Sequence, residues 1–429
     1  MIGGGIGCQV VAQNNETMIK IAIVNNGNLP LPAVKGGAVE GLIQLLIDYN
    51  EIYGNFQFEV YSTFDEIAEI KAKEYHYSSF HFVKEGSKAC NISKEFIRKL
   101  YNYVSRRMGG NYMPKHLFVE MAKDINSKKC LPVDAIVLEG ARLNAAYLKK
   151  QTGLPVIQRI HNTPTNKLGQ WDIDNAKSTD VFLGISKYIC KQLLLFEGNY
   201  CKNIELLYNA IDNRLFEKSL TMSEIATIRN RYNIQENDFV VVFTGRLQEY
   251  KGVKQLVEAV NNCRDIINLK LLIVGSNTFS AVSKTSFEKS LYELVGNNPN
   301  IVFTGYVPYN YIYKYYKIAN LAIFPSTWEE PFALTCLEAI SCGLPVIITR
   351  SGGMPEIVDE SCAVVVENDK QLEINIEKEI RRLYNSPDLL CAMSKNAQKR
   401  SKLFGSDQHY QKFSEIINHY LQVQKTRLS

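Results

Sequence analysis

The sequence has no long apolar run: none of its stretches reaches the roughly eighteen consecutive apolar residues of a membrane-spanning helix. Its N-terminus also lacks the positively charged region, apolar stretch and cleavage site of a secretory leader. We therefore expect a soluble, cytoplasmic protein.

Cysteine spacing and net charge exclude other classes. The ten cysteines form no CxxC pair and no Cys/His cluster with zinc spacing, so most should be small buried hydrophobes in a reducing compartment. The 49 Lys and Arg residues barely exceed the 44 Asp and Glu residues, which argues against a nucleic-acid partner. With 46% hydrophobic and 22% charged residues, the composition is that of a globular protein.

The first residues are rich in glycine without forming a nucleotide-binding motif. The glycines at positions 3, 4, 5 and 7 imitate a dinucleotide fingerprint, but no strand precedes them, and the fingerprint requires one. We interpret residues 1–17 as an N-terminal extension ahead of a start at Met18.

From Met18 onward the sequence alternates between strand and helix patterns. Compact runs of Val, Ile and Leu without polar alternation indicate strands covered on both faces, as in parallel sheets between helices. A first series of predicted strands comprises Ile19–Val24, Phe56–Tyr61, Ala135–Leu138, Val156–Ile160, Val181–Ile185 and Glu205–Tyr208. A second comprises Phe239–Thr244, Leu269–Val274, Ile301–Thr304, Leu321–Phe324, Val346–Thr349 and Ala363–Val366.

Two series of strands predict an α/β protein with two doubly wound, Rossmann-like domains facing a central cleft. We place the domains at residues 18–212 and 213–405, with a helical segment at 406–429. Ligands of such sheets bind at the carboxyl ends of the strands, so the cleft is the predicted site.

One segment after a predicted strand has the features of an anion site. Pro331 suits a first helical turn, so we expect a helix from near Glu330 to Ser341, with its first N–H groups facing the cleft. On that helix Glu330 and Glu338 would lie roughly 12 Å apart along the axis. They could hold hydroxyl groups at the two ends of a nucleotide-sugar, or be solvated helix carboxylates.

A basic pair follows the first strand of the second domain. Arg246, after Gly245, and Lys251, before Gly252, could hold a diphosphate, although a lone pair of this kind is usually surface charge.

Together with Gly343–Val346 and Gly352–Ile357, these residues resemble glycosyltransferase family four, the retaining GT-B enzymes of bacterial glycan, capsule or spore-coat type. The resemblance covers nearly all of residues 18–404. It implies that Arg246 and Lys251 bind the donor diphosphate, Glu330 the sugar and Glu338 the ribose. It further implies donor contacts from Gly245, Val307, Phe332, Ala333, Leu334 and Thr335. Ala333 departs from the family, which most often has Gly there.

The first domain, which the resemblance makes the acceptor domain, matches in fewer places. Gly36 and Gly37 resemble the family's glycine loop, and His161 resembles its active-site histidine, although one His in a loop is more often surface. For Ser186 and Asn209 we expect structural roles in capping and turns.

By this resemblance the protein is a hexosyltransferase that keeps the anomeric configuration of the donor sugar and needs no metal or other cofactor. The residues implied in catalysis are His161, Glu330, Arg246 and Lys251. A UDP-sugar is the favoured donor, and the acceptor is a glycan or lipid-linked molecule of cell-surface polysaccharide synthesis.

A basic, aromatic stretch at Lys94–Lys129 leaves two interpretations open. It could rest on an anionic membrane surface, or be a solvated basic helix that packs an apolar stripe on the first sheet. The tyrosines of Tyr306–Tyr316 have helical spacing typical of packing, not of base stacking. Residues 408–421 predict a helix, which in the family crosses back onto the first domain.

Other functions remain as alternatives. A catalytically silent, glycosyltransferase-like protein of an envelope or coat would not need the four residues Arg246, Lys251, Glu330 and Glu338. An epimerase or phosphorylase on the same frame is a further possibility by fold alone. A glycosidase fits poorly, because its two carboxyl groups lie about 5–9.5 Å apart, closer than the helical estimate for the glutamates.

Overall fold

The structure, a computed structural model, describes residues 18–84, 88–108, 112–127, 132–140, 144–164, 169–195, 198, 200–276 and 285–428. The interpretation of residues 1–17 as an extension concerns residues outside this description.

The first half of the chain forms a seven-stranded parallel sheet in the order β3-β2-β1-β4-β5-β6-β7. Its strands are β1 (Ile19–Val24), β2 (Phe56–Thr63), β3 (Ser78–Val83), β4 (Ala135–Glu139), β5 (Val156–Ile160), β6 (Val181–Gly184) and β7 (Ile204–Leu206). Its helices are α1 (Ala38–Tyr53), α2 (Glu66–Lys71), α3 (Lys88–Met108), α4 (His116–Asn126), α5 (Ala145–Thr152), α6 (Gln170–Ser178) and α7 (Lys187–Leu194), with a short helix η1 (Ala72–Glu74).

The second half forms a six-stranded parallel sheet in the order β10-β9-β8-β11-β12-β13. Its strands are β8 (Phe239–Thr244), β9 (Leu269–Val274), β10 (Ile301–Gly305), β11 (Leu321–Phe324), β12 (Val346–Thr349) and β13 (Ala363–Val366). Its helices are α8 (Asn213–Phe216), α9 (Met222–Arg231), α10 (Val253–Asn262), α11 (Ser286–Val295), α12 (Tyr309–Lys317), α13 (Leu334–Ser341), α14 (Leu372–Tyr384) and α15 (Pro387–Ser401), with short helices η3 (Glu249–Lys251), η4 (Met354–Glu356) and η5 (Lys402–Phe404).

Both faces of each sheet are covered, which explains the unbroken apolar runs. Successive side chains of a strand point to opposite faces. In β1, Ile21 and Ile23 join one core cluster, whereas Ala22 and Val24 join another. The same division occurs in β8 of the second sheet. The two predicted doubly wound sheets are therefore confirmed.

The edge strand β3 was not predicted from the sequence. It reads Ser-Ser-Phe-His-Phe-Val and lies at the end of the first sheet, where most of its side chains are only half-buried. An edge strand needs no unbroken apolar run, so its pattern is weak.

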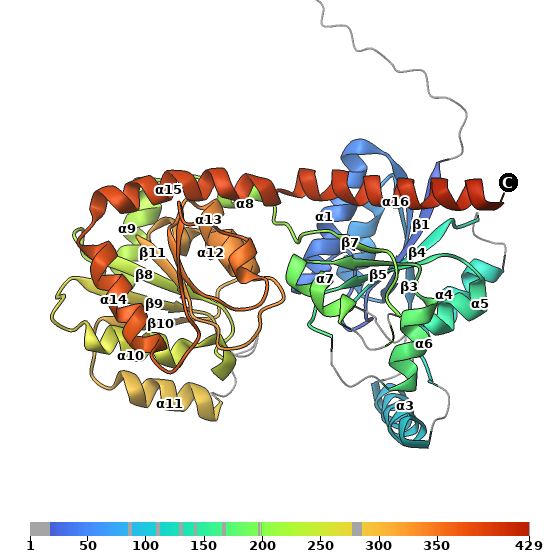
Figure 1. Ribbon diagram of the computed structural model, residues 1–429, viewed down its shortest axis with the longest axis horizontal. Coiled ribbons are helices and arrows are strands. Elements are labelled where there is room, and N and C mark those ends of the chain that lie inside the picture. Colours follow the sequence, from blue (N-terminus) through green and yellow to red (C-terminus); the bar gives the residue numbers. More distant parts are fainter. Residues whose placement is uncertain are drawn as a thin grey trace, which may run out of the picture.

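The last helix, α16 (Ser406–Leu428), begins beside the second half and runs along the first (Figure 1). Its Tyr410, Phe413 and Ile417 are fully buried in the core of the first sheet, and the Phe413 ring meets those of Phe56 and Phe58 edge to face. Near the start of this helix, Ile211 and Gly405 form a parallel bridge, so two passages of the chain between the halves lie side by side.

The expected burial of most cysteines and the expected packing of the tyrosines are borne out in the described residues. Five cysteine side chains are buried there: Cys201, Cys263, Cys336, Cys342 and Cys362. Helix α12 buries Tyr313, Tyr315 and Tyr316, which confirms packing for the tyrosine-rich segment.

Candidate functional site

The predicted cation and carboxylate of the second half meet at the carboxyl ends of two neighbouring strands. Lys251 ends η3 after β8, and Glu330 lies in the loop after β11. The Lys251 ammonium is paired with Glu330 Oε1, which also accepts a hydrogen bond of 2.8 Å from Ser326 Oγ. The Lys251 side chain is 22% exposed and that of Glu330 only 6%, so the cation alone reaches toward solvent.

A glycine makes this contact possible. Gly252 has a φ of +70°, and a Cβ there would lie 1.8 Å from the Pro325 carbonyl oxygen. Since only glycine tolerates that approach, the sequence Lys251-Gly252 brings the η3 turn against the loop after β11. Nearby, the Lys251 ammonium lies 5.7 Å from the ring centroid of Trp328 and 5.6 Å from that of Tyr250, within cation–π range.

Arg246 lies on the same loop but is exposed. Its guanidinium donates a 3.3 Å hydrogen bond to the Tyr250 hydroxyl, and the preceding Gly245 has a φ of +148°. Arg246 is therefore a cation at the surface of the loop that carries Lys251.

The expected helix start near Glu330 is wrong, because α13 begins at Leu334 with Ala333 as its N-cap. Two carbonyl groups that a helix would use are bonded elsewhere: that of Glu330 accepts from the Gly353 N–H at 2.7 Å, and that of Pro331 from Ser186 Oγ at 2.8 Å. Glu330 therefore lies outside the helix, and the helical estimate of its distance from Glu338 does not apply. The argument against a glycosidase, which used that distance, no longer holds.

The start of α13 still has backbone N–H groups without a partner inside the helix. The first N–H groups of a helix, here those of Leu334 and Thr335, have no carbonyl within the helix to bond. Both residues are half-buried, whereas Phe332 and Ala333 are buried beside them. Val307, after β10, is half-buried and packs against the same core cluster as Phe332.

Glu338 is buried inside α13 with a phenol as its partner. The Tyr316 hydroxyl donates to Glu338 Oε2 at 2.9 Å and also contacts Thr244 Oγ1 at 2.5 Å. Burial raises the pKa of Glu338 to about 7, against the opposing effect of the Tyr316 hydrogen bond. Sequence reasoning missed Tyr316, which it placed only in a packing helix.

In the first half, the glycine pair lies where α1 starts. Gly37 is the N-cap residue, with a φ of +104°, and a Cβ there would lie 2.2 Å from Glu40 Oε2. Glu40 Oε1 accepts a 3.0 Å hydrogen bond from the buried Asn25 amide, while burial raises the pKa of Glu40. Gly36 is exposed just before it.

His161 is buried in a charged cluster and is not a surface histidine. Its Nε2 lies 2.6 Å from Glu139 Oε2, and the Arg159 guanidinium lies 3.6 Å from Glu139 Oε1. Burial alone would favour a neutral Glu139, but Arg159 and His161 hold its pKa below the usual value. Burial also lowers the pKa of His161, against the effect of Glu139.

These contacts define the state of the imidazole. An ionised carboxylate only accepts hydrogen bonds, so Nε2 carries the proton and donates it to Glu139. A neutral ring then offers Nδ1 as an acceptor, suited to a substrate hydroxyl. Glu139 and Arg159 were missed from the sequence, although both lie at or near the carboxyl ends of buried strands, which was a usable signal.

Ser186 has the capping role expected of it, since it accepts from the Ile189 N–H at 3.1 Å at the start of α7. Asn209 does not lie in a turn as expected; its Oδ1 accepts a hydrogen bond of 2.9 Å from Arg159.

The halves are also joined by Glu356. Its carboxylate accepts hydrogen bonds of 2.7 Å from the N–H groups of both Lys187 and Tyr188, at the start of α7, and one of 3.0 Å from the Tyr208 hydroxyl. The glycine-rich motif before Glu356 thus serves the interface between the two halves.

The two clusters approach each other near Tyr188. Burial raises the pKa of the Tyr188 phenol, on which Thr163 acts from the His161 loop and Glu329 from the Glu330 loop. The loops that carry His161 and Glu330 therefore both come near one tyrosine of α7.

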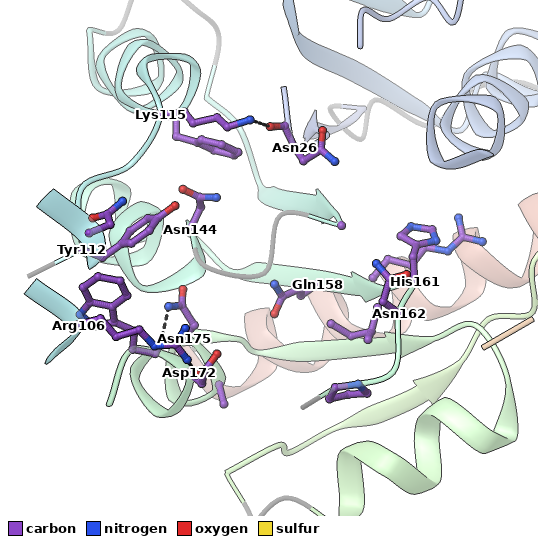
Figure 2. Close-up of a pocket in the computed structure, with 18 of the residues that line it drawn as sticks. Asn26, Arg106, Tyr112, Lys115, Asn144, Gln158, His161, Asn162, Asp172 and Asn175 are labelled. Atoms are coloured by element: carbon purple, nitrogen blue, oxygen red, sulfur yellow. Dashed lines mark hydrogen bonds and ion pairs between the residues drawn. The ribbon is translucent and has the colours of Figure 1, made fainter. Parts of the chain in front are cut away.

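A cavity of about 620 Å³ opens beside His161 within the first half. Figure 2 shows His161 and Asn162 at one end, Arg106 and Tyr112 at the other, and Gln158 between them. Strand β5, helix α6 and the basic helix α3 all contribute to its lining.

Asp172 and Asp174 form an Asp-x-Asp run, a spacing that can hold a divalent cation in other settings. Here both lie on α6, where residues two apart do not share a face. Asp172 Oδ2 accepts from the Gly169 N–H at 3.0 Å and pairs with Arg106 at 3.2 Å, whereas Asp174 accepts from Gln170. Across the described residues, no group of three His, Cys, Asp or Glu side chains is placed to hold a metal ion.

The basic stretch divides into two unlike helices. Helix α4 buries Leu117, Phe118 and Met121 in the first half. Helix α3 lies at the edge of that half (Figure 1) and exposes its apolar side chains: Phe96, Ile97, Leu100, Tyr101, Tyr103 and Val104. The interpretation that an apolar stripe packs on the sheet is therefore wrong for α3. In the described chain, no helix combines the length and apolar character needed to cross a membrane.

Comparisons with known proteins agree with this architecture. Residues 224–400, which lie in the second half, match the family model described as glycosyl transferases group 1. The uncharacterized glycosyltransferase MJ1607 of Methanocaldococcus jannaschii is 29% identical over 224 residues, which span 50% of this chain and 56% of that protein. The putative glycosyltransferase YtcC of Bacillus subtilis is 25% identical over 387 residues, 89% of this chain and 87% of its own.

A solved structure extends the likeness to both halves. HepE (Alr3699) of Anabaena, in complex with UDP, superimposes with a TM-score of 0.69 at 17% identity, covering 94% of this chain and all of that one. The fold is therefore GT-B, with two Rossmann-like domains.

Proposed function

We propose that this protein is a retaining glycosyltransferase that moves a sugar from a nucleoside-diphosphate sugar, with UDP favoured, to a glycan or lipid-linked acceptor in cell-surface polysaccharide synthesis. The observation that carries the proposal is the Lys251–Glu330 pair, formed across two strand ends within the segment that matches the glycosyltransferase model. The structure of HepE with UDP supports the choice of base.

The chemistry follows from the charges of the site. The donor diphosphate would lie against Lys251, Arg246 and the N–H groups at the start of α13, which together offset the negative charge that develops as it leaves. Glu330 accepts hydrogen bonds only, so it suits the sugar hydroxyls, and Glu338 suits those of the ribose. The acceptor hydroxyl would attack from the face that the diphosphate leaves, and the leaving phosphate would take up its proton.

The acceptor would enter the cavity of the first half. Its reacting hydroxyl would lie near His161, whose Nδ1 accepts a hydrogen bond while Glu139 holds the ring in place. Holding the acceptor in the reactive orientation lowers the entropic cost of the reaction, which is a large part of enzymatic acceleration.

A panel of UDP-, GDP-, ADP- and dTDP-sugars tests the donor. A ligand that binds only the folded state at about one hundred times its Kd raises stability by about 2.7 kcal/mol. We expect UDP-sugars to raise the melting temperature most and to be slowly hydrolysed by the purified protein, unchanged by excess EDTA. Binding without any hydrolysis or transfer would favour the catalytically silent alternative, and loss of turnover with EDTA would contradict the metal-independent reaction.

The exposed apolar and basic face of α3 supports a further part of the proposal, contact with an anionic membrane surface. We expect salt-sensitive flotation of the protein with anionic vesicles, because cations and apolar side chains on one helix bind the interfacial region together. Phe96→Ser should weaken flotation, whereas Met222→Ser, at a still more exposed site on α9, should not. Absence of salt-sensitive binding would end the membrane assignment.

A further inference from the structure

Arg159 contacts both the His161 cluster and a segment that connects the two halves. It lies on β5 and is fully buried, beside the Glu139 carboxylate that holds the imidazole. Its Nη2 donates to Asn209 Oδ1 at 2.9 Å. Asn209 belongs to the first connecting segment, which runs from β7 to α8. One guanidinium therefore faces the carboxylate that orients the imidazole and is also bonded to a connection between the halves.

A buried histidine lies in the second connecting segment. His409, near the start of α16, is 5% exposed, and its Nδ1 lies 2.7 Å from the carbonyl oxygen of Tyr208 in the first segment. A carbonyl oxygen only accepts hydrogen bonds, so Nδ1 carries the proton and donates it. Burial lowers the pKa of His409 well below its usual value, and the nearby charge of Arg159 lowers it further. The ring is therefore neutral, and its Nε2 is an acceptor.

This buried cluster contains donors and acceptors that are not bonded to each other. Within the described residues, Nε and Nη1 of Arg159 have no hydrogen-bond partner, and the same holds for Glu139 Oε1 and His409 Nε2. Nη1 lies 3.6 Å from Glu139 Oε1, whereas a charge-assisted hydrogen bond is about 2.7–2.9 Å long. Buried polar atoms without partners cost free energy, so two such donors and two such acceptors point to a second arrangement in which they bond.

Tyr208 links the cluster to the second half. Its ring contacts that of Phe332, with 6.1 Å between the centroids, and its hydroxyl donates to Glu356 at 3.0 Å. Phe332 lies just before α13, whose first N–H groups are assigned to the donor diphosphate. Movement of this loop would therefore reach Tyr208, and through it both its neighbour Asn209 and its partner His409.

We propose that Arg159 is a positioning residue whose partners change as the halves move relative to each other: Asn209 in the arrangement of this structure, Glu139 Oε1 and His409 Nε2 in the second arrangement. In the second arrangement Arg159 fixes Glu139 and so orients the His161 imidazole. Donor binding favours that arrangement to the extent that the donor binds it more tightly. The inference rests on the proposed function and adds a coupling between donor binding in one half and the imidazole in the other.

Nitrogen-15 NMR of the full chain, labelled at histidine, tests the change of partners. The His409 ring is identified by its Nδ1-protonated form and by the loss of its signals in variants at this position. We expect addition of UDP to shift the His409 Nε2 signal toward that of a hydrogen-bonded nitrogen, since this atom would gain the Arg159 donor. His419, exposed on the same helix, is the internal control and should not shift.

Two variants of His409 separate positioning from folding. His409→Asn keeps an amide donor near the Nδ1 position for Tyr208 but removes the acceptor at Nε2, so kcat of UDP-sugar hydrolysis should fall roughly tenfold with KM unchanged. His409→Gln places an amide near the Nε2 position and should retain most of kcat. A purely structural role would give the opposite order, because only Asn keeps the bond to Tyr208. His419→Asn should leave kcat and KM unchanged.

Three results would overturn the inference while leaving the proposed function in place. They are a His409 signal that stays constant although calorimetry shows UDP bound, a kcat unchanged by His409→Asn, and a kcat that His409→Gln lowers at least as much. The NMR titration uses the unaltered chain, so it decides the matter even where a variant fails to fold. Failure of UDP-sugars to bind or react would instead contradict the proposed function.

Discussion

The two halves of the molecule each bring a cation to a buried carboxylate, but they leave those cations in different environments. In the first half, the side chains of Glu139 and Arg159 are fully buried, and His161 is 5% exposed. In the second, Lys251 remains 22% exposed beside the nearly buried Glu330. The first cluster is buried beside the cavity and positions a ring, whereas the second leaves a charge accessible to a ligand.

Removing the accessible cation should have the largest effect. Lys251→Ala leaves Glu330 buried without its partner and removes a charge from the proposed diphosphate site, so we expect turnover to fall by roughly a hundredfold to a thousandfold. Steady-state rates of donor hydrolysis and transfer measure this. Lys254→Ala, an exposed lysine of α10, is the matched control. Near-normal turnover of Lys251→Ala would refute the site assignment.

Removing the cation of the buried cluster should instead appear as lost stability. Arg159→Met leaves the Glu139 carboxylate buried without its cation, which we expect to lower the free energy of unfolding by about 3–5 kcal/mol. Urea denaturation measures the loss, and adding Glu139→Gln should restore part of it. Equal stability of Arg159→Met and the wild type would contradict the pairing of Arg159 with Glu139.

Glu338 differs from both Glu139 and Glu330, because its described partner is the Tyr316 phenol and not a cation. Its pKa, raised by burial to about 7, lies above that of the unfolded chain, so the folded state binds the proton more tightly. Relative to Glu338→Gln, the wild type should be most stable below about pH 4.5 and lose roughly 3 kcal/mol as the pH rises to about 7. Parallel urea curves across this range would contradict the buried carboxyl group.

Ser186 should give the smallest effect, since it links the halves through a hydroxyl alone. Ser186→Ala removes an N-cap and the hydrogen bond to the Pro331 carbonyl, for an expected loss of about 1 kcal/mol. Thr221→Ala removes a cap within one half and serves as the comparison. If both variants lose the same stability but only Ser186→Ala weakens binding of UDP-sugars, the contact between halves matters for the donor.

Most of the architecture could be predicted from the sequence, because strands covered on both faces must be apolar throughout. The runs at Ile19–Val24 and Phe239–Thr244 are such strands, and both were found at their observed bounds. The edge strand Ser78–Val83 escaped because one side of it lacks a neighbouring strand and most of its side chains are half-buried.

The residues of the site could be predicted from the sequence, but the contacts between them could not. The sequence indicated Lys251 and Glu330, yet placed Glu330 on a helix, since Pro331 suits a first turn. What excludes that turn is the approach of Gly353 and Ser186, residues distant in the chain. Likewise, the partner of His161 is Glu139, which becomes its neighbour only because β4 and β5 pair.

The bridge between Ile211 and Gly405 has a mechanical consequence. Both segments that connect the halves pass through one narrow region and pair there side by side. Two adjacent connections resist sliding and twisting but allow bending, so we expect any opening or closing of the two halves to be a rotation about that region. The residues farthest from it would then travel most.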